Sequence, residues 1–256
     1  VMGDDDLSKF VINDMCHSGI NFHCNLDRDR ITTEKQTFIA NDYRLLKVDK
    51  VDNRPISART LERFCESITG TEADAYVFSD FRHGIFNRDT IPKLIDCLPT
   101  QGLRVADSQV ASRWGNILEF KGFDLITPNE REARFALADQ DSVIRPLALE
   151  LYKLAQCKTL ILKLGNKGTL TYRAPSDSSG SFFSLDALAK NVIDPVGAGD
   201  ALLAYSTLAL TLNKNAPVTA SILGSIAAAI ACETDGNNPV SPESVVKKLN
   251  DIRSCI

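Results

Sequence analysis

The stretch Asn191-Val-Ile-Asp-Pro-Val-Gly-Ala-Gly-Asp200 carries the strongest structural signal in the chain, because the apolar, small-residue run Ala201–Leu212 follows it at once. This pattern predicts a glycine-rich turn that opens a buried helix near Ala198. Gly197 and Gly199 lack a Cβ atom, so the amides of Gly197-Ala198-Gly199 can point at one spot, where the helix dipole adds positive charge. We therefore expect an anion to bind at this turn.

Two carboxylates flank the turn. Asp200 falls in the first turn of the predicted helix, where it can accept a proton from an alcohol that attacks phosphorus. Asp194 precedes the turn, and its carboxylate either helps to hold a metal or other cation or only caps the loop. A helix N-cap with glycines for a tight turn is the competing interpretation, and it is the more common one for a bare Gly-x-Gly-Asp motif. Other motifs are needed to decide between the two.

Three motifs in the expected order resemble the ribokinase family, the PfkB carbohydrate kinases. Asp194-Pro-Val-Gly-Ala-Gly-Asp200 resembles the D-T-x-G-A-G-D signature of that family, and Thr127-Pro-Asn-Glu-Arg-Glu-Ala133 resembles its T-P-N-x-x-E segment. Thr159-Leu-Ile-Leu-Lys-Leu-Gly-Asn-Lys-Gly168 is similar to the family's strand that ends in x-G-x-x-G. The resemblance implies a ribokinase-like three-layer α/β sandwich with a mostly parallel central sheet and a small β lid hairpin.

The same resemblance implies phosphoryl transfer from ATP to a sugar hydroxyl, with Mg²⁺ as cofactor. Asp200 is then the catalytic base, and the Gly197-Ala198-Gly199 amides form the anion hole. Asn129 and Glu132 lie three residues apart at a helix start, so both can face a hydrated magnesium ion. A capping box of Asn129 with Glu132 fits the sequence equally well. A monovalent cation near Asp194 is left open.

The nucleotide is expected along the third motif and the C-terminal turn. Lys163 ends an apolar strand, at a position where the family more often has Thr, and its ammonium can supply a point charge to phosphates. Gly165 and Gly168 follow it, although simple turn chemistry explains both glycines as well. The resemblance also places the turn 234–239, with Asn237, around the adenine.

Within the family, several segments look closest to the heptose-phosphate kinase domain of the bifunctional enzyme that makes ADP-heptose. They are Ser79–Gly84, Asn41–Asp49 and Gly236–Glu243. In the first of these, Arg82 is the expected partner of a substrate phosphate through its planar guanidinium. A solvated loop arginine is the competing interpretation.

The resemblance begins inside the family pattern. Val1–Asp6 looks like the V-x-G-x-D segment that follows the family's first strand and its G-G-A-x-N-x-A helix, neither of which is present in the given sequence. Pro195 also replaces the usual Thr, which removes a hydroxyl and an N–H group. We therefore predict one N-terminally truncated kinase domain over residues 1–256. The alternatives are a non-catalytic nucleotide-binding remnant and a dimerising scaffold of a multi-domain enzyme.

Composition agrees with a cytoplasmic enzyme that acts on small molecules. The chain has 256 residues, 44% of them hydrophobic, and a formal charge of −4, which gives no basic field for nucleic acid or an anionic membrane. No apolar stretch reaches the ~20 residues that span a bilayer. The seven scattered cysteines are predicted to be reduced thiols, mostly small buried hydrophobes.

Strands alternate with helices along most of the chain, which predicts a parallel sheet. Asp80, Asp107 and Asn129 each follow an apolar strand, so they are expected on one rim of that sheet. Residues 21–52 depart from this pattern, with short strands at Glu34–Ala40 and Tyr43–Val48 joined by Asn41-Asp42. This hairpin is the predicted lid, and a homodimer through it is the predicted assembly.

Overall fold

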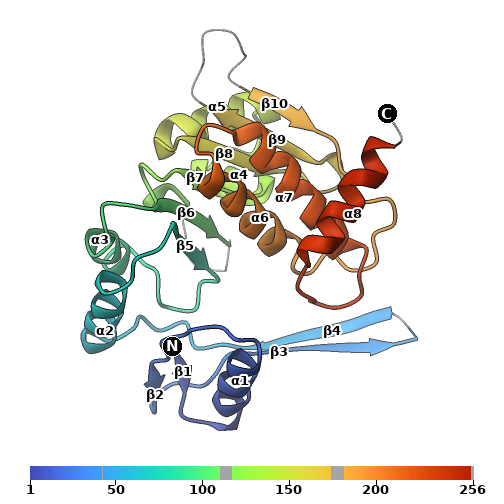
Figure 1. Ribbon diagram of the computed structural model, residues 1–256. Helices are drawn as coiled ribbons and strands as arrows, with labels where there is room; N and C mark the ends of the chain where they lie inside the picture. The colour runs from blue at the N-terminus through green and yellow to red at the C-terminus, as the bar shows by residue number, and fades with distance from the viewer. Residues whose placement is uncertain (42, 110–116, 174–181, 255–256) are drawn as a thin grey trace. The chain divides into compact units, whose positions relative to one another are not determined.

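The computed structural model describes residues 1–41, 43–109, 117–173 and 182–254, which form two units (Figure 1). The first unit comprises Val1–Thr71 and Arg82–Pro99, and the second comprises Glu72–Phe81 and Thr100–Ile256. The second unit contains the predicted sheet, and the first contains the predicted hairpin.

A six-stranded sheet forms the centre of the second unit, in the order β10-β9-β8-β7-β6-β5. Its strands are β5 (Ala75–Asp80), β6 (Leu103–Ser108), β7 (Leu125–Ile126), β8 (Thr159–Lys163), β9 (Thr169–Arg173) and β10 (Phe182–Leu185). Strands β5 to β8 run parallel, and β9 and β10 are antiparallel. The middle residues of β8, Leu160 to Leu162, are fully buried, as expected for a strand that helices cover on both faces.

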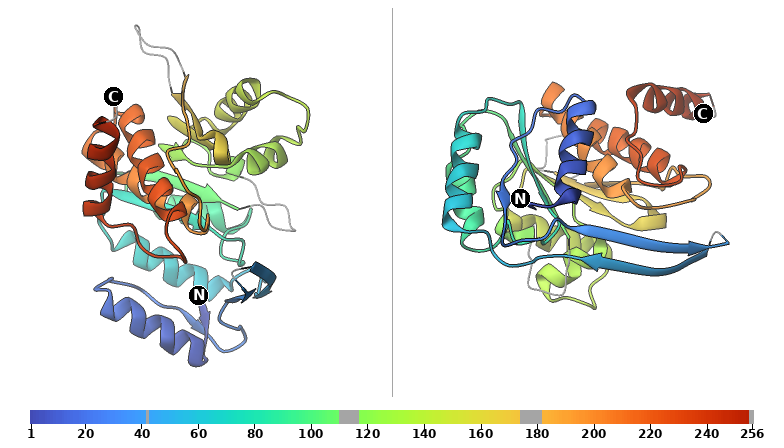
Figure 2. Two further views of the ribbon diagram at one scale, coloured as in Figure 1. Left: turned by 90° about the vertical axis from the view of Figure 1, so that its right-hand side faces the viewer. Right: turned by 90° about the horizontal axis from the view of Figure 1, so that it is seen from below.

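Helices cover both faces of this sheet (Figure 2). The elements are α4 (Glu130–Leu137), α5 (Ile144–Ala155), α6 (Ala198–Leu212), α7 (Pro217–Cys232), α8 (Pro242–Arg253) and the short 3₁₀ helices Ile117–Glu119 and Gly165–Lys167. The leucines of α6 pack against Leu103, Val105 and Ile161, α7 contacts α6, and α8 contacts α7. Helices α4 and α5 lie on the other face. This arrangement confirms the predicted three-layer α/β sandwich.

Three phenylalanines pack together near the start of β7. Phe78, Phe120 and Phe123 meet edge to face with ring centroids 5.4 to 5.8 Å apart, and all three side chains are buried. Aromatic rings favour this geometry because the positive edge of one ring meets the negative face of another. The cluster is therefore a source of stability for the second unit.

The first unit combines helices with two small pairs of strands. Its elements are β1 (Met2–Gly3), α1 (Asp6–His17), β2 (Leu26–Asp27), β3 (Glu34–Ala40), β4 (Tyr43–Lys50), α2 (Ala58–Thr69) and α3 (Thr90–Asp96). β1 and β2 pair in parallel, and β3 and β4 form an antiparallel hairpin with a bulge between Phe38 and Ile39. The predicted hairpin is confirmed, with its second strand two residues longer than expected; Asp42 of the turn lies outside the described residues.

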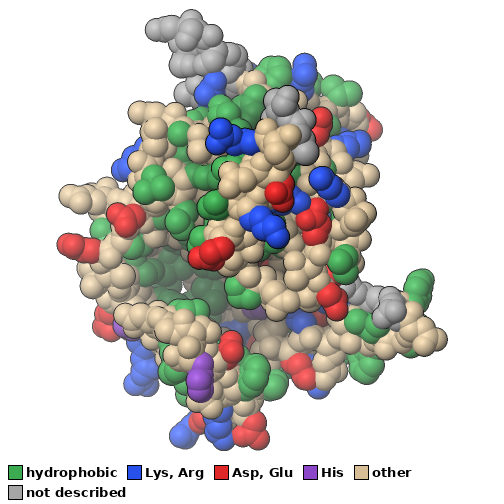
Figure 3. All heavy atoms as spheres, turned by 45° about the vertical axis from the view of Figure 1, so that its right-hand side comes forward, with side chains coloured by type: hydrophobic (Ala, Val, Ile, Leu, Met, Phe, Trp, Pro, Cys, Tyr) green, Lys and Arg blue, Asp and Glu red, His purple; other side chains and the backbone are tan. Residues whose placement is uncertain are grey.

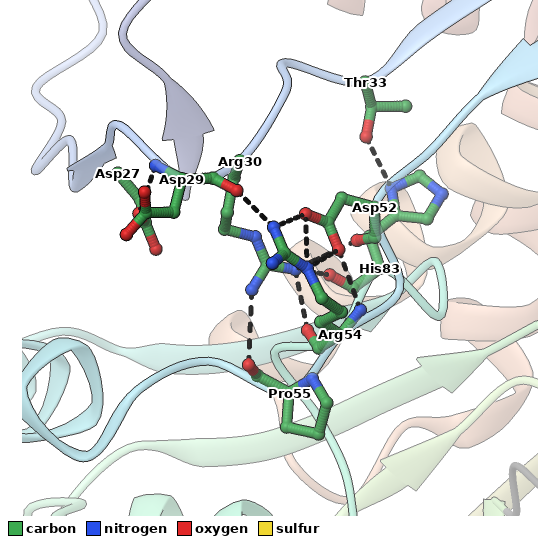
Figure 4. Close-up of polar contacts among 8 residues, drawn as sticks. All are labelled: Asp27, Asp29, Arg30, Thr33, Asp52, Arg54, Pro55 and His83. Carbon is green, nitrogen blue, oxygen red and sulfur yellow. Dashed lines mark hydrogen bonds and ion pairs between the residues drawn. The ribbon is translucent and has the colours of Figure 1, made fainter.

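Arg30 ties together the loops of the first unit (Figure 4). Its guanidinium donates hydrogen bonds to the carbonyl oxygens of Arg54, Asp52, His83 and Pro55, at 2.7, 2.9, 3.2 and 3.4 Å. The side chain of Asp52 accepts hydrogen bonds from Arg54, which lowers the pKa of Asp52 to about 2. Three segments distant in sequence are thereby fixed to one another by one side chain.

Hydrophobic side chains gather on the hairpin (Figure 3). Five of them are at least half exposed: Phe38, Ile39, Tyr43, Leu45 and Leu46. Apolar surface of this extent on a strand pair is typical of a surface that binds another chain.

Two cysteines correct the sequence prediction. Cys65 of α2 and Cys97, which follows α3, form a disulfide, with their Cα atoms 5.4 Å apart. The packing of α2 against α3 brings them together, although 32 residues separate them in the sequence and no local motif marks the pair. Cys16 is exposed and Cys157 is buried; burial raises the pKa of the Cys157 thiol to about 12. Cys255 lies outside the described residues.

Among the described residues, no helix is both long enough and apolar enough to span a membrane.

Candidate functional site

A cavity of about 740 Å³ opens in the second unit, where the carboxyl ends of the parallel strands meet the start of α6. Nine of the residues predicted for the site line it: Asn129, Glu132, Lys163, Gly165, Gly168, Gly197, Ala198, Gly199 and Asp200. Ligands of open α/β sheets bind at this edge, because loops and helix starts converge there. Of the three residues predicted on the rim, Asp107 and Asn129 line this cavity, whereas Asp80 is not among its lining residues.

The first turn of α6 faces this cavity. Gly197 is its N-cap, with φ of 80°, a left-handed conformation that favours glycine, and among the described residues no side chain caps the helix. A helix start leaves its first amides without backbone partners, so these amides suit an anion. Asp200 lies in the same turn and is exposed to solvent. The turn therefore places amides suited to an anion next to a carboxylate.

Asn237 lies against Gly197. A Cβ atom at position 197 would collide with the Asn237 amide oxygen, so only glycine fits there without a shift of the neighbouring turn. Asn237 itself is absent from the cavity lining. The described contact supports a role for Asn237 in shaping the anion turn, and its predicted contact with the nucleotide stays a prediction.

Asn129 and Glu132 form the capping box that the sequence offered as an alternative. The Asn129 side chain accepts a hydrogen bond from the Glu132 amide at 2.9 Å, and the Glu132 carboxylate accepts one from the Asn129 amide at 2.7 Å. Burial raises the pKa of Glu132, while the positive charge of Lys163 opposes that rise. Both residues also line the cavity, so their role as a capping box does not remove them from it.

Lys163 makes an ion pair that sequence reasoning missed. Its Nζ atom lies 3.0 and 3.1 Å from the two carboxylate oxygens of Asp107, and both side chains are largely buried. Asp107 was expected on the rim because it follows an apolar strand, but nothing in the sequence links it to Lys163, 56 residues away. The pair joins the ends of β6 and β8.

Ser225 of α7 is a second residue that sequence reasoning missed. It lines the cavity, its side chain is buried, and its hydroxyl has no hydrogen-bond partner within the described part of the chain. A buried hydroxyl without a partner costs free energy, which a ligand with a polar group can recover. Its position midway along an apolar helix gives no sequence signal for this role.

Asp194 lies at the foot of the same loop. Its carboxylate accepts a hydrogen bond from the Val196 amide at 3.1 Å, so it caps the turn, and its own amide and that of Ile193 donate to the Cys232 carbonyl. Asp194 is not among the residues that line the cavity. Capping was one of the two roles left open by the sequence, and the cation role stays a prediction.

Arg82 belongs to the first unit. Its φ of 63° is left-handed, which is uncommon outside glycine, and its side chain is buried. The two residues that follow are held from outside the loop: Arg30 donates to the His83 carbonyl at 3.2 Å, and the Ile56 amide donates to the Gly84 carbonyl at 3.1 Å. These bonds hold the backbone that directly follows Arg82; the contact of Arg82 with a substrate phosphate stays a prediction.

Magnesium fits the chemistry of this cavity. Over the described ranges no three His, Cys, Asp or Glu side chains cluster in the manner of an all-protein metal site. Mg²⁺ is commonly held by one or two carboxylates together with substrate phosphates, so such a cluster is not required. Glu132 offers the carboxylate, and burial of that group makes a neighbouring cation favourable.

Comparison with known proteins gives the same family along nearly the whole chain. The sequence pattern of the pfkB family carbohydrate kinases matches residues 1–244. The bifunctional protein HldE of Desulfatibacillum aliphaticivorans is 27% identical over 260 residues, which cover 98% of this chain and 51% of HldE. HldE of Rhodopseudomonas palustris strain CGA009 is 28% identical, with 97% of this chain and 51% of HldE covered. The chain thus spans about half the length of these curated relatives.

Solved structures give the same fold. Phosphofructokinase-2 from Escherichia coli, in a complex with potassium, aligns with a TM-score of 0.80 at 16% identity, covering 98% of this chain and 80% of that one. Ribokinase from Thermotoga maritima aligns with a TM-score of 0.74 at 20% identity, covering 97% of this chain and 79% of that one. At these identities the likeness establishes the ribokinase-like fold.

Proposed function

Because the chain belongs to the pfkB family of carbohydrate kinases, we propose that it transfers the γ-phosphoryl group of ATP to a hydroxyl of a sugar or sugar phosphate. One observation carries the proposal: the uncapped start of α6, Asp200, Lys163 and Glu132 line a single cavity. Phosphoryl transfer needs a cradle for phosphate charge and a base for the attacking hydroxyl, and this cavity offers both.

Asp200 is the proposed base. It lies in the first turn of α6, beside the amides of Gly197, Ala198 and Gly199, where a hydroxyl attacking a bound phosphoryl group would arrive. These amides stabilise the charge that develops on the phosphoryl oxygens. The carboxylate and the amides thus act on the two partners of the same reaction.

Asn129 and Glu132 are the proposed residues for Mg²⁺, with Glu132 acting directly or through water. When bound, the ion neutralises negative charge on the triphosphate. The buried carboxylate of Glu132 gains from such a cation, because burial disfavours its own charge. A monovalent cation near Asp194 is a further proposal; its only support is that the turn it caps adjoins the anion site.

The nucleotide is proposed to extend from the anion turn along the apolar part of the cavity. Gly165 and Gly168 line one side, and Ser225 lies with Ala228 and Ala229 on the α7 side. Small side chains leave room for a flat base, and the unpaired Ser225 hydroxyl suits a polar atom of the nucleoside. Asn237 lies near the phosphate end through its contact with Gly197.

A heptose phosphate is the proposed acceptor, and Arg82 the proposed contact for its phosphate. The choice rests on the sequence resemblance of the Ser79–Gly84 segment and on the match to HldE proteins. The hydrogen bond from Arg30 to the His83 carbonyl supports the role, because it limits the motion of the loop that carries Arg82.

A homodimer through the β3–β4 hairpin is proposed from its exposed apolar side chains. An isolated two-stranded hairpin is marginally stable, so a second copy that covers this surface would stabilise it. Light scattering at micromolar concentration should give a particle mass twice that of the chain, and the Leu45→Lys variant should have the mass of a single chain. A monomer in both cases would contradict the dimer.

We propose a cytoplasmic location, where ATP is supplied. The Cys65–Cys97 disulfide counts against it, since cytosolic thiols are usually kept reduced. Counting free thiols on protein isolated under alkylating conditions decides whether this bond forms in cells.

The proposed function is tested by two measurements on one preparation. Calorimetric titration with Mg²⁺ and a non-hydrolysable ATP analogue measures nucleotide binding, and a coupled assay measures ADP formation with ribose, fructose phosphate or heptose phosphate. Binding with turnover on one acceptor supports the kinase. Binding without turnover on any acceptor supports the nucleotide-binding remnant, and absence of both supports the scaffold.

A further inference from the structure

We propose that Asp107 is a positioning residue: it holds the Lys163 ammonium beside the first turn of α6, and Lys163 leaves it for the phosphate oxygens of the bound nucleotide. This inference rests on the proposed function, because it assigns a device to the same cavity. The inference assigns a role to Asp107, for which none was expected from the sequence. It also means that the Lys163 ammonium supplies positive charge next to the proposed anion site.

The geometry shows how the pair forms across the sheet. Asp107 is on β6 and Lys163 is on β8, with β7 between them, so their strands are about 10 Å apart, or two inter-strand spacings. β7 is only two residues long, Leu125–Ile126, and the long lysine stem reaches across the end of this strand. The Lys163 amide donates to the Pro128 carbonyl at 2.9 Å, which fixes the base of that stem.

The ammonium lies beside a helix start, where a cation is disfavoured. A Cβ atom built on Gly199 would be 3.3 Å from Lys163 Nζ, so the ammonium is close to the first turn of α6. The amino end of a helix carries partial positive charge and repels a cation. The Asp107 carboxylate offsets that repulsion, which explains how a lysine is accommodated beside the helix start.

Burial makes the pair more than a surface contact. The side chains of Lys163 and Asp107 are 17% and 13% exposed, so little water is available to replace either partner. Two positive groups, the ammonium and the helix start, therefore lie beside one part of the cavity, and the Asp107 carboxylate forms an ion pair with the ammonium there. A phosphate that enters is met by both, and it takes over the ammonium as its new partner.

The direction in which Asp107→Asn changes phosphate affinity distinguishes this positioning role from simple charge repulsion. If Asp107 only added negative charge to an anion site, Asp107→Asn would strengthen phosphate binding. If Asp107 positions Lys163, the same change lets the flexible lysine stem move away, and binding weakens.

The experiment is a double-mutant cycle of the wild-type chain, Asp107→Asn, Lys163→Met and the double variant. Calorimetry measures Kd for the Mg²⁺ complex of a non-hydrolysable ATP analogue, and for tripolyphosphate without magnesium. We expect Asp107→Asn to weaken both ligands about tenfold in the wild-type background and less than about twofold in the Lys163→Met background. Tighter binding, or an equal fold-change in both backgrounds, overturns the proposal.

Controls separate this inference from folding and from the proposed function. Lys158→Met removes an exposed lysine that pairs with Asp124 at the other end of the sheet, and it should leave both Kd values unchanged. Urea unfolding checks each variant, and Lys163→Gln replaces Lys163→Met if the latter does not fold. If the wild-type chain shows no kinase turnover but Asp107 and Lys163 still affect ligand binding jointly, only the proposed function is contradicted. If the wild-type chain binds neither ligand, both the proposed function and the positioning role are overturned.

Discussion

The two ends of the central sheet carry the same kind of ion pair in different surroundings. At the carboxyl ends, Lys163 and Asp107 lie 3.0 Å apart with 17% and 13% of their side chains exposed. At the amino ends, Lys158 and Asp124 lie 2.6 Å apart; Asp124 is 15% exposed, but Lys158 is 76% exposed. Water reaches the Lys158 ammonium and screens the second pair, so it contributes little, whereas the first faces a cavity. Burial of the lysine, more than charge or distance, distinguishes the two pairs.

Backbone groups differ between these ends in the same way. At the amino ends, Asp124 accepts a hydrogen bond from the Arg104 amide at 2.8 Å, and the Gly122 amide donates to the Ala155 carbonyl at 3.0 Å. At the carboxyl ends, α6 starts without a side-chain cap. One end uses its polar groups to hold the fold, and the other leaves donors for a ligand.

The largest expected effect is on catalysis at the carboxyl ends. Asp200→Asn should lower kcat by roughly 10²–10⁴-fold, the usual cost of losing a positioned base, while the Kd of the nucleotide analogue changes little. Steady-state kinetics and calorimetry measure the two quantities. Asp251→Asn, on α8 and outside this cavity, is the matched control. Unchanged turnover in Asp200→Asn would remove the residue from the mechanism.

A core substitution near the start of β7 should affect stability instead. Phe123→Ala should lower the free energy of unfolding by about 3–5 kcal/mol, because it empties a fully buried site in the aromatic cluster. Urea unfolding measures the loss. Nucleotide affinity below the unfolding transition should stay near that of the wild-type chain; a large fall in affinity would mean that the two ends are not separable.

Two glycines with similar backbones refine the comparison. Gly197 (φ 80°) and Gly122 (φ 73°) are both left-handed, so replacing either with Ala should cost about 1–2 kcal/mol of stability. Gly197→Ala would also collide with Asn237, whereas at Gly122 no atom of the described residues lies within 4 Å of the Cβ position. We expect Gly197→Ala alone to weaken nucleotide binding in calorimetry. Equal affinities for the two variants would count against an anion site at α6.

The smallest expected effect is a pH dependence at Glu132. Burial raises its pKa in the folded chain above the value of 4.5, so folding favours the neutral acid. The free energy of unfolding of the wild-type chain should therefore fall, relative to that of Glu132→Gln, as pH rises from 4.5 through the raised pKa. Urea unfolding at about pH 4 and about pH 8, with EDTA present, measures it.

Glu130→Gln, on the same helix and paired with Arg134 at 2.8 Å, is the matched control for that series. Glu130 is the more exposed of the two glutamates, so comparing the two variants isolates the effect of burying Glu132. A pH-independent difference for Glu132→Gln would contradict the burial argument.

Local pattern predicted the sheet and the anion turn, because both depend on residues near in sequence. The apolar run Thr159–Lys163 and the glycines before α6 determine their own backbone conformations. Contacts between residues distant in the sequence were not predictable in this way. The Lys163–Asp107 pair and the Cys65–Cys97 disulfide join residues 56 and 32 positions apart. Only the packing of strands or helices makes them neighbours.

Arg30 has a consequence for how the first unit can vary. Its guanidinium donates hydrogen bonds to four carbonyl groups, those of Asp52, Arg54, Pro55 and His83. Segments distant in sequence are more often joined by the backbone hydrogen bonds of a paired strand. A strand demands matched lengths on both sides, whereas a single guanidinium demands only that each carbonyl come within reach. Loops between these points can therefore gain or lose residues without a change in the anchored geometry. The same arrangement depends on one residue, because a substitution of Arg30 removes all four hydrogen bonds at once.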